Sequence, residues 1–298
     1  MDHRAFLATL SPRDHAALTK RSDRAGLGHL AGHVALIVAL ATPIGLGWPG
    51  WWLALLPLGV ALAFLFTLEH ECTHQTPFAT VALNEAVGRV AGFIIFQPFL
   101  WFRYFHLAHH RHTNDPERDP ELASPKPESR AALLWYLASL GYWRAKILLH
   151  WRNAFGPIVA PYLPPATQSR LRREARVSIV LYIAAALFTL FVSDILIWVW
   201  LLPLALGFPV LRLYLLAEHG GCPMVADMFQ NTRTTFTTAA VRFLAWNMPY
   251  HAEHHAFPSV PFHRLGEFHL RAAPHLGVTE NGYGRFVRRY VEGMAAHR

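Results

Sequence analysis

The chain has 298 residues, of which 53% are hydrophobic and only 15% are charged. This composition is too apolar for an ordinary water-soluble domain and indicates an integral membrane protein. Its only cysteines, Cys72 and Cys222, exclude a disulfide framework, a cysteine-based zinc cluster and a four-thiolate iron–sulfur centre within the chain.

The net charge of +8 has two explanations in a membrane protein. It fits a basic side that contacts anionic lipid head groups, and it also fits a surface that docks an acidic electron carrier. A nucleic-acid partner would require a basic domain or a recognisable motif, and the sequence has neither. We therefore expect no nucleic-acid partner.

The N-terminal third predicts one membrane hairpin. Residues 1–30 carry no sustained apolar run, so we expect a cytosolic tail rather than a cleaved secretory signal. Two apolar stretches follow, at 34–46 and 51–68, and the GWPG between them is typical of a tight turn. Since roughly 20 residues are needed to cross a bilayer, we expect the first helix to extend back toward His29.

The middle of the chain predicts an interfacial region. The apolar stretch from Val90 to Trp101 is too short to span a membrane and contains Gln97 and Pro98, so we expect it to be interfacial or re-entrant. Residues 113–130 are rich in proline and charge, which predicts a loop.

A second membrane hairpin is predicted in the C-terminal half. Residues 164–176 are typical of a basic helix that begins at proline and leads into the third span. The two apolar stretches of this hairpin lie at 177–193 and 195–216, with a turn near Ser193 and Asp194.

The distribution of charge predicts the topology. Residues 31–68 and 177–211 contain no Lys or Arg, so both termini and the central segment should lie in the cytoplasm, most simply at a bacterial inner membrane. We predict an all-α integral membrane protein with four transmembrane helices in two hairpins, an interfacial helix and a cytosolic cap. Its single domain divides into a tail (1–30), a first hairpin (31–69), a cytosolic or interfacial region (70–176), a second hairpin (177–218) and the cap (219–298).

Eight histidines fall into three short boxes on the predicted cytosolic side. The spacing of three or four residues turns the imidazoles of each box to one face of a helix, and imidazole is the commonest side-chain metal ligand. The boxes are HECTH with His70 and His74, HLAHH with His106, His109 and His110, and HAEHH with His251, His254 and His255.

This number of ligands predicts two metal ions, because a mononuclear zinc site uses three or four protein ligands. His219, at the end of the fourth span, is a plausible ninth ligand. Neutral nitrogen ligands suit iron, copper or zinc. A redox metal at the end of a lipid-facing bundle can activate oxygen against an apolar substrate, so iron with dioxygen is the expected pair.

The three boxes and their spacing resemble those of the membrane fatty acid desaturase superfamily, over about residues 30 to 270. NMPYHAEHHAFPSVPFHRL and HLAHHRHTNDPERDPE are the segments most similar to that family. The resemblance implies that the eight box histidines and His219 hold two iron ions in an enzyme that uses O2. It implies a mushroom of membrane helices under a cytosolic cap.

The resemblance further implies a desaturase that introduces a double bond into a fatty-acyl or other lipid-like chain. A hydroxylase or ketolase acting on a lipid or carotenoid is the alternative, because these enzymes share the boxes. The sequence has no cytochrome b5 module of the HPGG type. We therefore expect a separate electron donor of the ferredoxin, rubredoxin or cytochrome b5 type.

Several neighbours of the boxes are candidates for supporting the ligands. Glu71 lies about 100° around the helix from His70 and is expected to orient a ligand rather than bind metal. His112, Asn247 and Tyr250 are further candidates for hydrogen bonds to a ligand or to bound water. The charged residues that can hold a ligand N–H or simply be solvated are Asp115, Glu117, Asp119 and Glu253. We expect surface or interfacial positions for His3, His15, His29, His33, His150, His263, His269, His275 and His297.

Three other interpretations of these motifs fit the sequence less well. HECTH matches the H-E-x-x-H pattern of zinc metalloproteases, but an intramembrane protease leaves six histidines without a role. A carboxylate-rich di-iron bundle requires paired Glu-x-x-His motifs, and only Glu71 with His74 fits. A metal transporter should carry ionisable groups along its spans, and these spans are nearly free of them.

Overall fold

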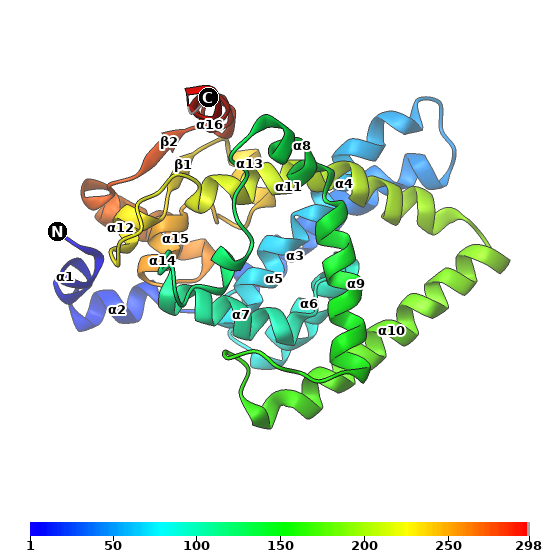
Figure 1. Ribbon diagram of the computed structural model, residues 1–298, viewed down its shortest axis with the longest axis horizontal. Helices are drawn as coiled ribbons and strands as arrows, with labels where there is room; N and C mark the ends of the chain where they lie inside the picture. The colour runs from blue at the N-terminus through cyan, green and yellow to red at the C-terminus, as the bar shows by residue number, and fades with distance from the viewer. Residues whose placement is uncertain (297–298) are drawn as a thin grey trace.

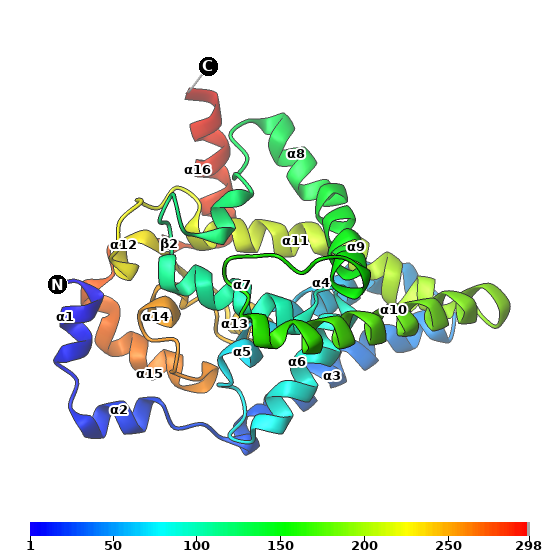
Figure 2. The ribbon, with the colours of Figure 1, turned by 60° about the horizontal axis from the view of Figure 1, so that its bottom comes forward.

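The computed structural model describes residues 1–296 and is mostly helical. Within this range, four helical segments are long and apolar enough to cross a membrane, as the sequence predicts. They form two hairpins whose turns lie at the end of the molecule opposite helices α1 and α15 (Figure 2). The segments are Pro12–Gly45, Trp51–His74, Pro165–Phe191 and Ile197–His219.

The first span is longer than the apolar stretch that predicts it. Helix α3 (Asp23–Gly45) starts where the Ser22 side chain accepts a hydrogen bond from the Ala25 amide, and Asp23 occupies its first turn. The expected extension toward His29 is therefore confirmed, and the helix begins before the predicted boundary at residue 31.

The second and fourth spans pack closely against each other through glycine. A Cβ atom on Gly59 would lie only 1.8 Å from the Pro203 carbonyl oxygen. A Cβ atom on Gly207 would lie 2.0 Å from the Gly59 carbonyl carbon. Small residues at such a crossing let two membrane helices approach backbone to backbone. The elements of these spans are η1 (Trp51–Ala54), α4 (Leu55–Ala63), α5 (Leu65–His74), the π-helical turn η4 (Ile197–Leu201) and α11 (Leu202–His219).

The first and third spans lie on the outside of this pair. In their most apolar parts, the first span has 11% of its residues buried and the third has 6%. The corresponding shares are 56% in the second span and 39% in the fourth. The third span is α10 (Gln168–Phe191), which continues the predicted basic segment into the membrane. Its exposed side chains include Val180, Leu190 and Phe191, which suit contact with lipid.

The two helices that follow the first hairpin are too short to cross a membrane. Helices α6 (Val81–Ile94) and α7 (Phe99–His112) are separated by a break at Phe96, which has a φ of 60°, and at Gln97 and Pro98. The predicted interruption of this apolar stretch is therefore confirmed.

Two helices that were not predicted follow the loop after α7, which contains the short turn η2 (Pro120–Ala123). Helix α8 (Arg130–Ala138) and helix α9 (Leu140–Phe155) expose large apolar side chains such as Trp135 and Trp151. Helix α9 packs against α10, and its Trp143 ring lies 4.4 Å from that of Phe208 on α11 (Figure 1). After α9 the chain reaches α10 through the turn η3 (Pro165–Thr167).

The remaining elements form a cap at the end of the bundle where the box histidines lie. Strands β1 and β2 pair in parallel with Thr235 opposite Glu280, a small sheet that the all-α prediction did not include. The cap comprises α12 (Met228–Asn231), β1 (Thr234–Phe236), α13 (Ala239–Leu244), α14 (His251–Ala256), α15 (Phe262–Ala272), η5 (Ala273–His275), β2 (Thr279–Asn281) and α16 (Tyr283–Ala296).

The N-terminal segment packs on this cap instead of forming a loose tail. Its helices are α1 (His3–Ala8) and α2 (Pro12–Leu18). His3 Nδ1 lies 3.0 Å from an Asp227 carboxylate oxygen, and Arg271 pairs with Asp14 at 2.6 Å. The buried Phe6 ring packs against Phe229 and Phe268 of the cap.

Candidate metal centre

The fold brings all nine predicted ligands together. Box one ends α5, box two ends α7, His219 ends α11, and box three forms α14. Three of the four helices that carry these histidines, α5, α7 and α11, therefore belong to the bundle or lie beside it. Only α14 belongs to the cap. All nine side chains are buried except that of His74, which is half-buried.

The Nε2 atoms of these imidazoles converge. Four contacts join different helices: His70 to His254 at 2.8 Å, His74 to His106 at 2.9 Å, His109 to His219 at 3.2 Å and His251 to His219 at 3.3 Å. The spacing of the boxes explains the convergence, because residues three or four apart on a helix lie on one face.

The ligand atoms separate into two groups. Within each group every ligand atom lies within 4.8 Å of the others. His251 belongs to neither group by this measure, but it contacts His219 of the smaller one. The larger group contains His70, His74, His106, His110 and His254, and the smaller contains His109, His219 and His255.

Carboxylates lie behind three of the imidazoles. Nδ1 of His109 donates to Asp119 at 2.9 Å. Nδ1 of His254 lies 3.7 Å from Glu71, and Nδ1 of His251 lies 3.4 Å from Glu218. A carboxylate at Nδ1 leaves the Nε2 lone pair free, which is the usual arrangement around metal-bound histidine.

Neutral groups and one more carboxylate complete the surroundings. His219 Nδ1 lies 3.3 Å from the Asn231 carbonyl oxygen, and the Thr113 hydroxyl lies 3.1 Å from His255 Nδ1. Glu121 approaches from the other side, with its carboxylate 3.3 Å from His109 Nε2. Neither Glu121 nor Glu218 is predictable from the sequence, because each lies outside a box and comes close to the cluster only when the loop and the span fold.

The other candidates near the boxes lie in different surroundings. The Asn247 amide donates to the Phe262 carbonyl, and the Tyr250 ring stacks on His269. Glu253 pairs with His269 and accepts from Thr234.

Three further candidates, His112 at the end of α7 and two residues of the loop that follows, make no hydrogen bond to the box histidines within residues 1–296. Asp115 binds Arg118 at the surface, and Glu117 is exposed. Within residues 1–296, no hydrogen bond joins the half-buried His112 to a box histidine.

The expectation that the scattered histidines occupy the surface or interface is wrong for His3 and His150, which are buried, and for His33, which is fully buried. Its Nε2 lies 2.9 Å from the Ala61 carbonyl oxygen, and the Trp246 indole donates to its Nδ1 at 3.2 Å. These bonds tie α3 to α4 and to the cap. His297 lies outside the described residues.

Burial keeps most imidazoles of boxes two and three neutral. It is the larger of two causes that lower the pKa of His106, His110, His254 and His255 well below the usual value, and the neighbouring imidazoles are the second. Burial also acts to lower the pKa of His109, but the carboxylates of Glu121 and Asp119 outweigh it and raise that pKa. Neutral imidazole is the form that binds metal.

The donor set fits metal ions. Among the described residues, both ring nitrogens of His110 and Nε2 of His255 are buried without a hydrogen-bond partner. Buried polar atoms without a partner are rare in folded proteins and call for an explanation such as a bound ion. Two groups of convergent imidazole nitrogens provide enough ligands for two ions.

A cavity of about 600 Å³ opens directly onto the imidazoles. His70, His106, His109 and His251 form one part of its wall. Its other walls come from α7, α9, α11 and the loop before α8. Phe66, Phe102 and Phe105 contribute apolar surface, whereas Glu121, Lys126, Lys146, Arg152, Arg212 and Glu218 contribute charge.

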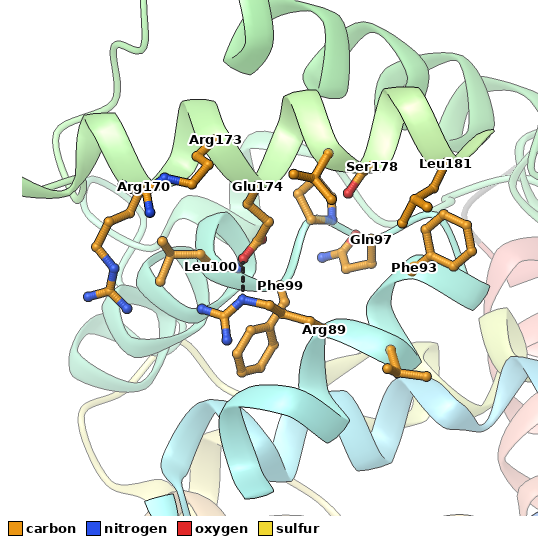
Figure 3. A pocket seen from close by; sticks show the side chains of 13 residues that line it. Arg89, Phe93, Gln97, Phe99, Leu100, Arg170, Arg173, Glu174, Ser178 and Leu181 are labelled. Atoms are coloured by element: carbon orange, nitrogen blue, oxygen red, sulfur yellow. Dashed lines mark hydrogen bonds and ion pairs between the residues drawn. The ribbon is translucent and has the colours of Figure 1, made fainter. Parts of the chain in front are cut away.

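A second cavity of about 470 Å³ lies between α6, α7 and α10 and includes no box histidine (Figure 3). Arg89 crosses it to reach Glu174 at 3.0 Å, and Leu181 and Phe93 line its apolar end. Gln97 lines both cavities and accepts a hydrogen bond from Tyr142. Of these two cavities, only the first is in contact with the imidazoles.

The fold and the site define a class: a membrane-spanning helical protein that gathers three histidine boxes into a buried cluster at one end of its bundle. The family model for fatty acid desaturase matches residues 46–284. The chain belongs to the fatty acid desaturase family, and its enzymatic class is that of an oxidoreductase.

Curated relatives agree with this assignment at low identity. The chain is 26% identical to dihydrorhizobitoxine desaturase of Bradyrhizobium elkanii over 80% of its own length and 74% of the relative. It is 22% identical to sn-1 oleoyl-lipid 12-desaturase of Anabaena variabilis, with 85% and 67% covered. It is 24% identical to acyl-lipid (9+3)-(E)-desaturase of Dimorphotheca sinuata, with 78% and 68% covered.

Proposed function

We propose that this protein is an oxygen-dependent di-iron desaturase that introduces a double bond into a lipid-like chain. The observation that carries the proposal is the division of the clustered imidazoles into two adjacent groups that share one cavity wall. The eight box histidines and His219 would hold the two ions. Iron, when bound, supplies the oxidising power that breaks an unactivated C–H bond with O2 and two electrons.

The side chains around the cluster position the reaction. Asp119 accepts a hydrogen bond from His109 Nδ1, which holds that ring in one orientation, and the carboxylates of Glu71 and Glu218 lie 3.7 and 3.4 Å from Nδ1 of His254 and His251. The apolar rings that line the cavity beside the imidazoles exclude water from the reacting carbon. A single methylene must be held at about 3–3.5 Å from the oxidant, so the rigidity of these walls determines the rate.

Orientation and partners complete the proposal. Both termini and the metal centre face the cytoplasm, in keeping with the basic residues that flank the spans. The electrons come from a separate protein of the ferredoxin, rubredoxin or cytochrome b5 type. The chain acts as one domain with the five segments predicted from its sequence, because the cap contributes α14 to the same cluster as the spans.

The test combines metal analysis with product analysis. Purified protein should contain two iron ions per chain, and His109→Ala should lose iron and all turnover. His112→Ala is the matched control, because His112 lies on the same helix and is not bonded to the cluster. It should retain both iron and activity.

Mass spectrometry of apolar metabolites from cells with and without the active chain identifies the reaction. Loss of two hydrogens supports desaturation, whereas gain of one oxygen identifies hydroxylation instead. A single zinc ion per chain, or full activity of His109→Ala, contradicts the proposal.

A further inference from the structure

We propose that the substrate carries an anionic group, a carboxylate or a phosphate, which binds between Lys146 and Arg212. This inference rests on the proposed function, because it concerns the same cavity. The cavity of about 600 Å³ contains both the imidazoles and these two cations. The reacting carbon therefore lies close to the anionic group of a compact amphiphile.

The two cations converge from different helices. Lys146 lies on α9 with its Nζ 4.9 Å from the ring centre of Tyr142 and 5.4 Å from that of Trp101. Arg212 lies on α11 with its guanidinium carbon 3.5 Å from the ring centre of Tyr136 and 5.4 Å from that of Tyr142. Because both cations lie close to the Tyr142 ring, the two charges are neighbours in the wall of the cavity.

Neither cation has an acidic partner. Within residues 1–296, no carboxylate lies within 4.0 Å of the charged atoms of Lys146 or Arg212. Of the other charged groups that line the cavity, Lys126 lies 3.5 Å from Glu121, Glu218 lies 3.4 Å from His251, and Arg152 is exposed. Glu69 is fully buried and opposes the lowering of the Lys146 pKa, but it does not line the cavity and forms no ion pair within residues 1–296.

Lys146 and Arg212 are half-buried, so a purely hydrocarbon substrate that filled the cavity would remove water from two cations without compensation, which is costly. An anion placed between them removes that cost. The planar guanidinium of Arg212 matches the two oxygens of a carboxylate or phosphate. Burial lowers the pKa of Lys146 to about 8, with Glu69 opposing the shift, so this amine keeps its proton at neutral pH.

The rest of the lining suits the apolar part of such a molecule. Trp101, Phe105, Leu149 and Leu215 line the cavity together with the imidazoles. Its volume is in the range of sites that enclose one small ligand. A compact amphiphile therefore satisfies both kinds of surface at once.

The experiment measures binding without turnover. Purified, metal-loaded protein in lipid nanodiscs, without reductant, is titrated calorimetrically with octanoate, octyl phosphate and octanol. These probes share one chain and differ only in the head group. We expect one or both anions to bind at least about tenfold more tightly than octanol, which corresponds to about 1.4 kcal/mol. Preference for octanoate or for octyl phosphate identifies the anion.

The double variant K146M/R212M removes the charges and keeps apolar side chains of similar length. It should bind all three probes equally, and K146R should retain the preference. R144M is the matched control on α9, because Arg144 is exposed and lies outside the cavity. Equal affinity of the wild type for octanol and the anions overturns the inference, and so does a preference that survives in K146M/R212M.

The two proposals fail in different ways. If the protein binds the anions selectively but oxidises nothing, the proposed function is wrong and this inference stands. If it oxidises a neutral lipid and binds octanol as tightly as octanoate, this inference is wrong and the function stands. Because carboxylate and phosphate also bind metal ions, a preference in the wild type is assigned to the two cations only by its loss in a folded variant. If K146M/R212M does not fold, K146M and R212M are measured singly, and a preference that survives in both overturns the inference.

Discussion

Replacement of Asp119 by Asn tests how the loop after box two supports the cluster. Three N–H groups donate to the Asp119 carboxylate: His109 Nδ1 at 2.9 Å, the Asn114 amide at 2.8 Å and the Glu121 amide at 2.9 Å. Asparagine offers one acceptor oxygen in place of two, so its amide nitrogen must face at least one of these buried donors. Leaving a buried donor without a partner costs about 1–3 kcal/mol.

The expected consequence is weaker metal binding. Loss of a residue that orients a metal-bound imidazole typically lowers metal affinity by about 10–100-fold, equivalent to about 1.4–2.7 kcal/mol. Iron retained against graded chelator concentrations measures the effect, and thermal unfolding of the same samples shows whether the fold is intact. Asp115→Asn is the control, since its carboxylate binds only Arg118 and a local amide at the surface. Iron retention by a folded Asp119→Asn variant equal to that of the wild type refutes the reasoning.

Two further predictions concern pH and packing. Iron retention should fall as the pH drops through the raised pKa of His109, because only the neutral imidazole binds metal. The variant Glu121→Gln removes a carboxylate that raises this pKa, so it should shift the loss of iron to lower pH. An unshifted pH profile would contradict the role of Glu121. Gly207→Ala should destabilise the fold by about 3 kcal/mol or more, because the new methyl group meets the Gly59 backbone. Gly28→Ala, on an open face of α3, should be neutral or stabilising, and similar melting temperatures for the two variants would exclude the packing argument.

The four spans and the cluster were predictable because both signals are local. The length of an apolar stretch predicts a membrane span, and the spacing in HLAHH places three imidazoles on one side of its helix. The turn from α7 was not predictable in this way. Asn114, with a φ of 57°, reverses the chain so that Asp119 returns to His109, whereas Asp115 in the same loop points to the surface.

The walls of the cavity depend on tertiary structure and could not be predicted. Helix α9 has charged and apolar residues all around it, so its sequence does not show which side chains face α11. Only the packing of Trp143 and Tyr142 on Phe208 places Lys146 opposite Arg212. Likewise, Glu218 has no motif of its own, and it becomes a neighbour of His251 only when the cap closes over the end of α11.

A small cap is enough to complete the histidine cluster, because most of the ligands lie outside it. Boxes one and two and His219 lie at helix ends that the spans and α7 already hold in place, so the cap has to deliver only α14. Helices α1 and α2 hold that cap from the outside through Asp227 and Arg271. The ions proposed here would join α14 to the bundle, so the free energy of their binding would also stabilise the docked cap. They would then serve structure as well as chemistry, through the imidazoles of box three.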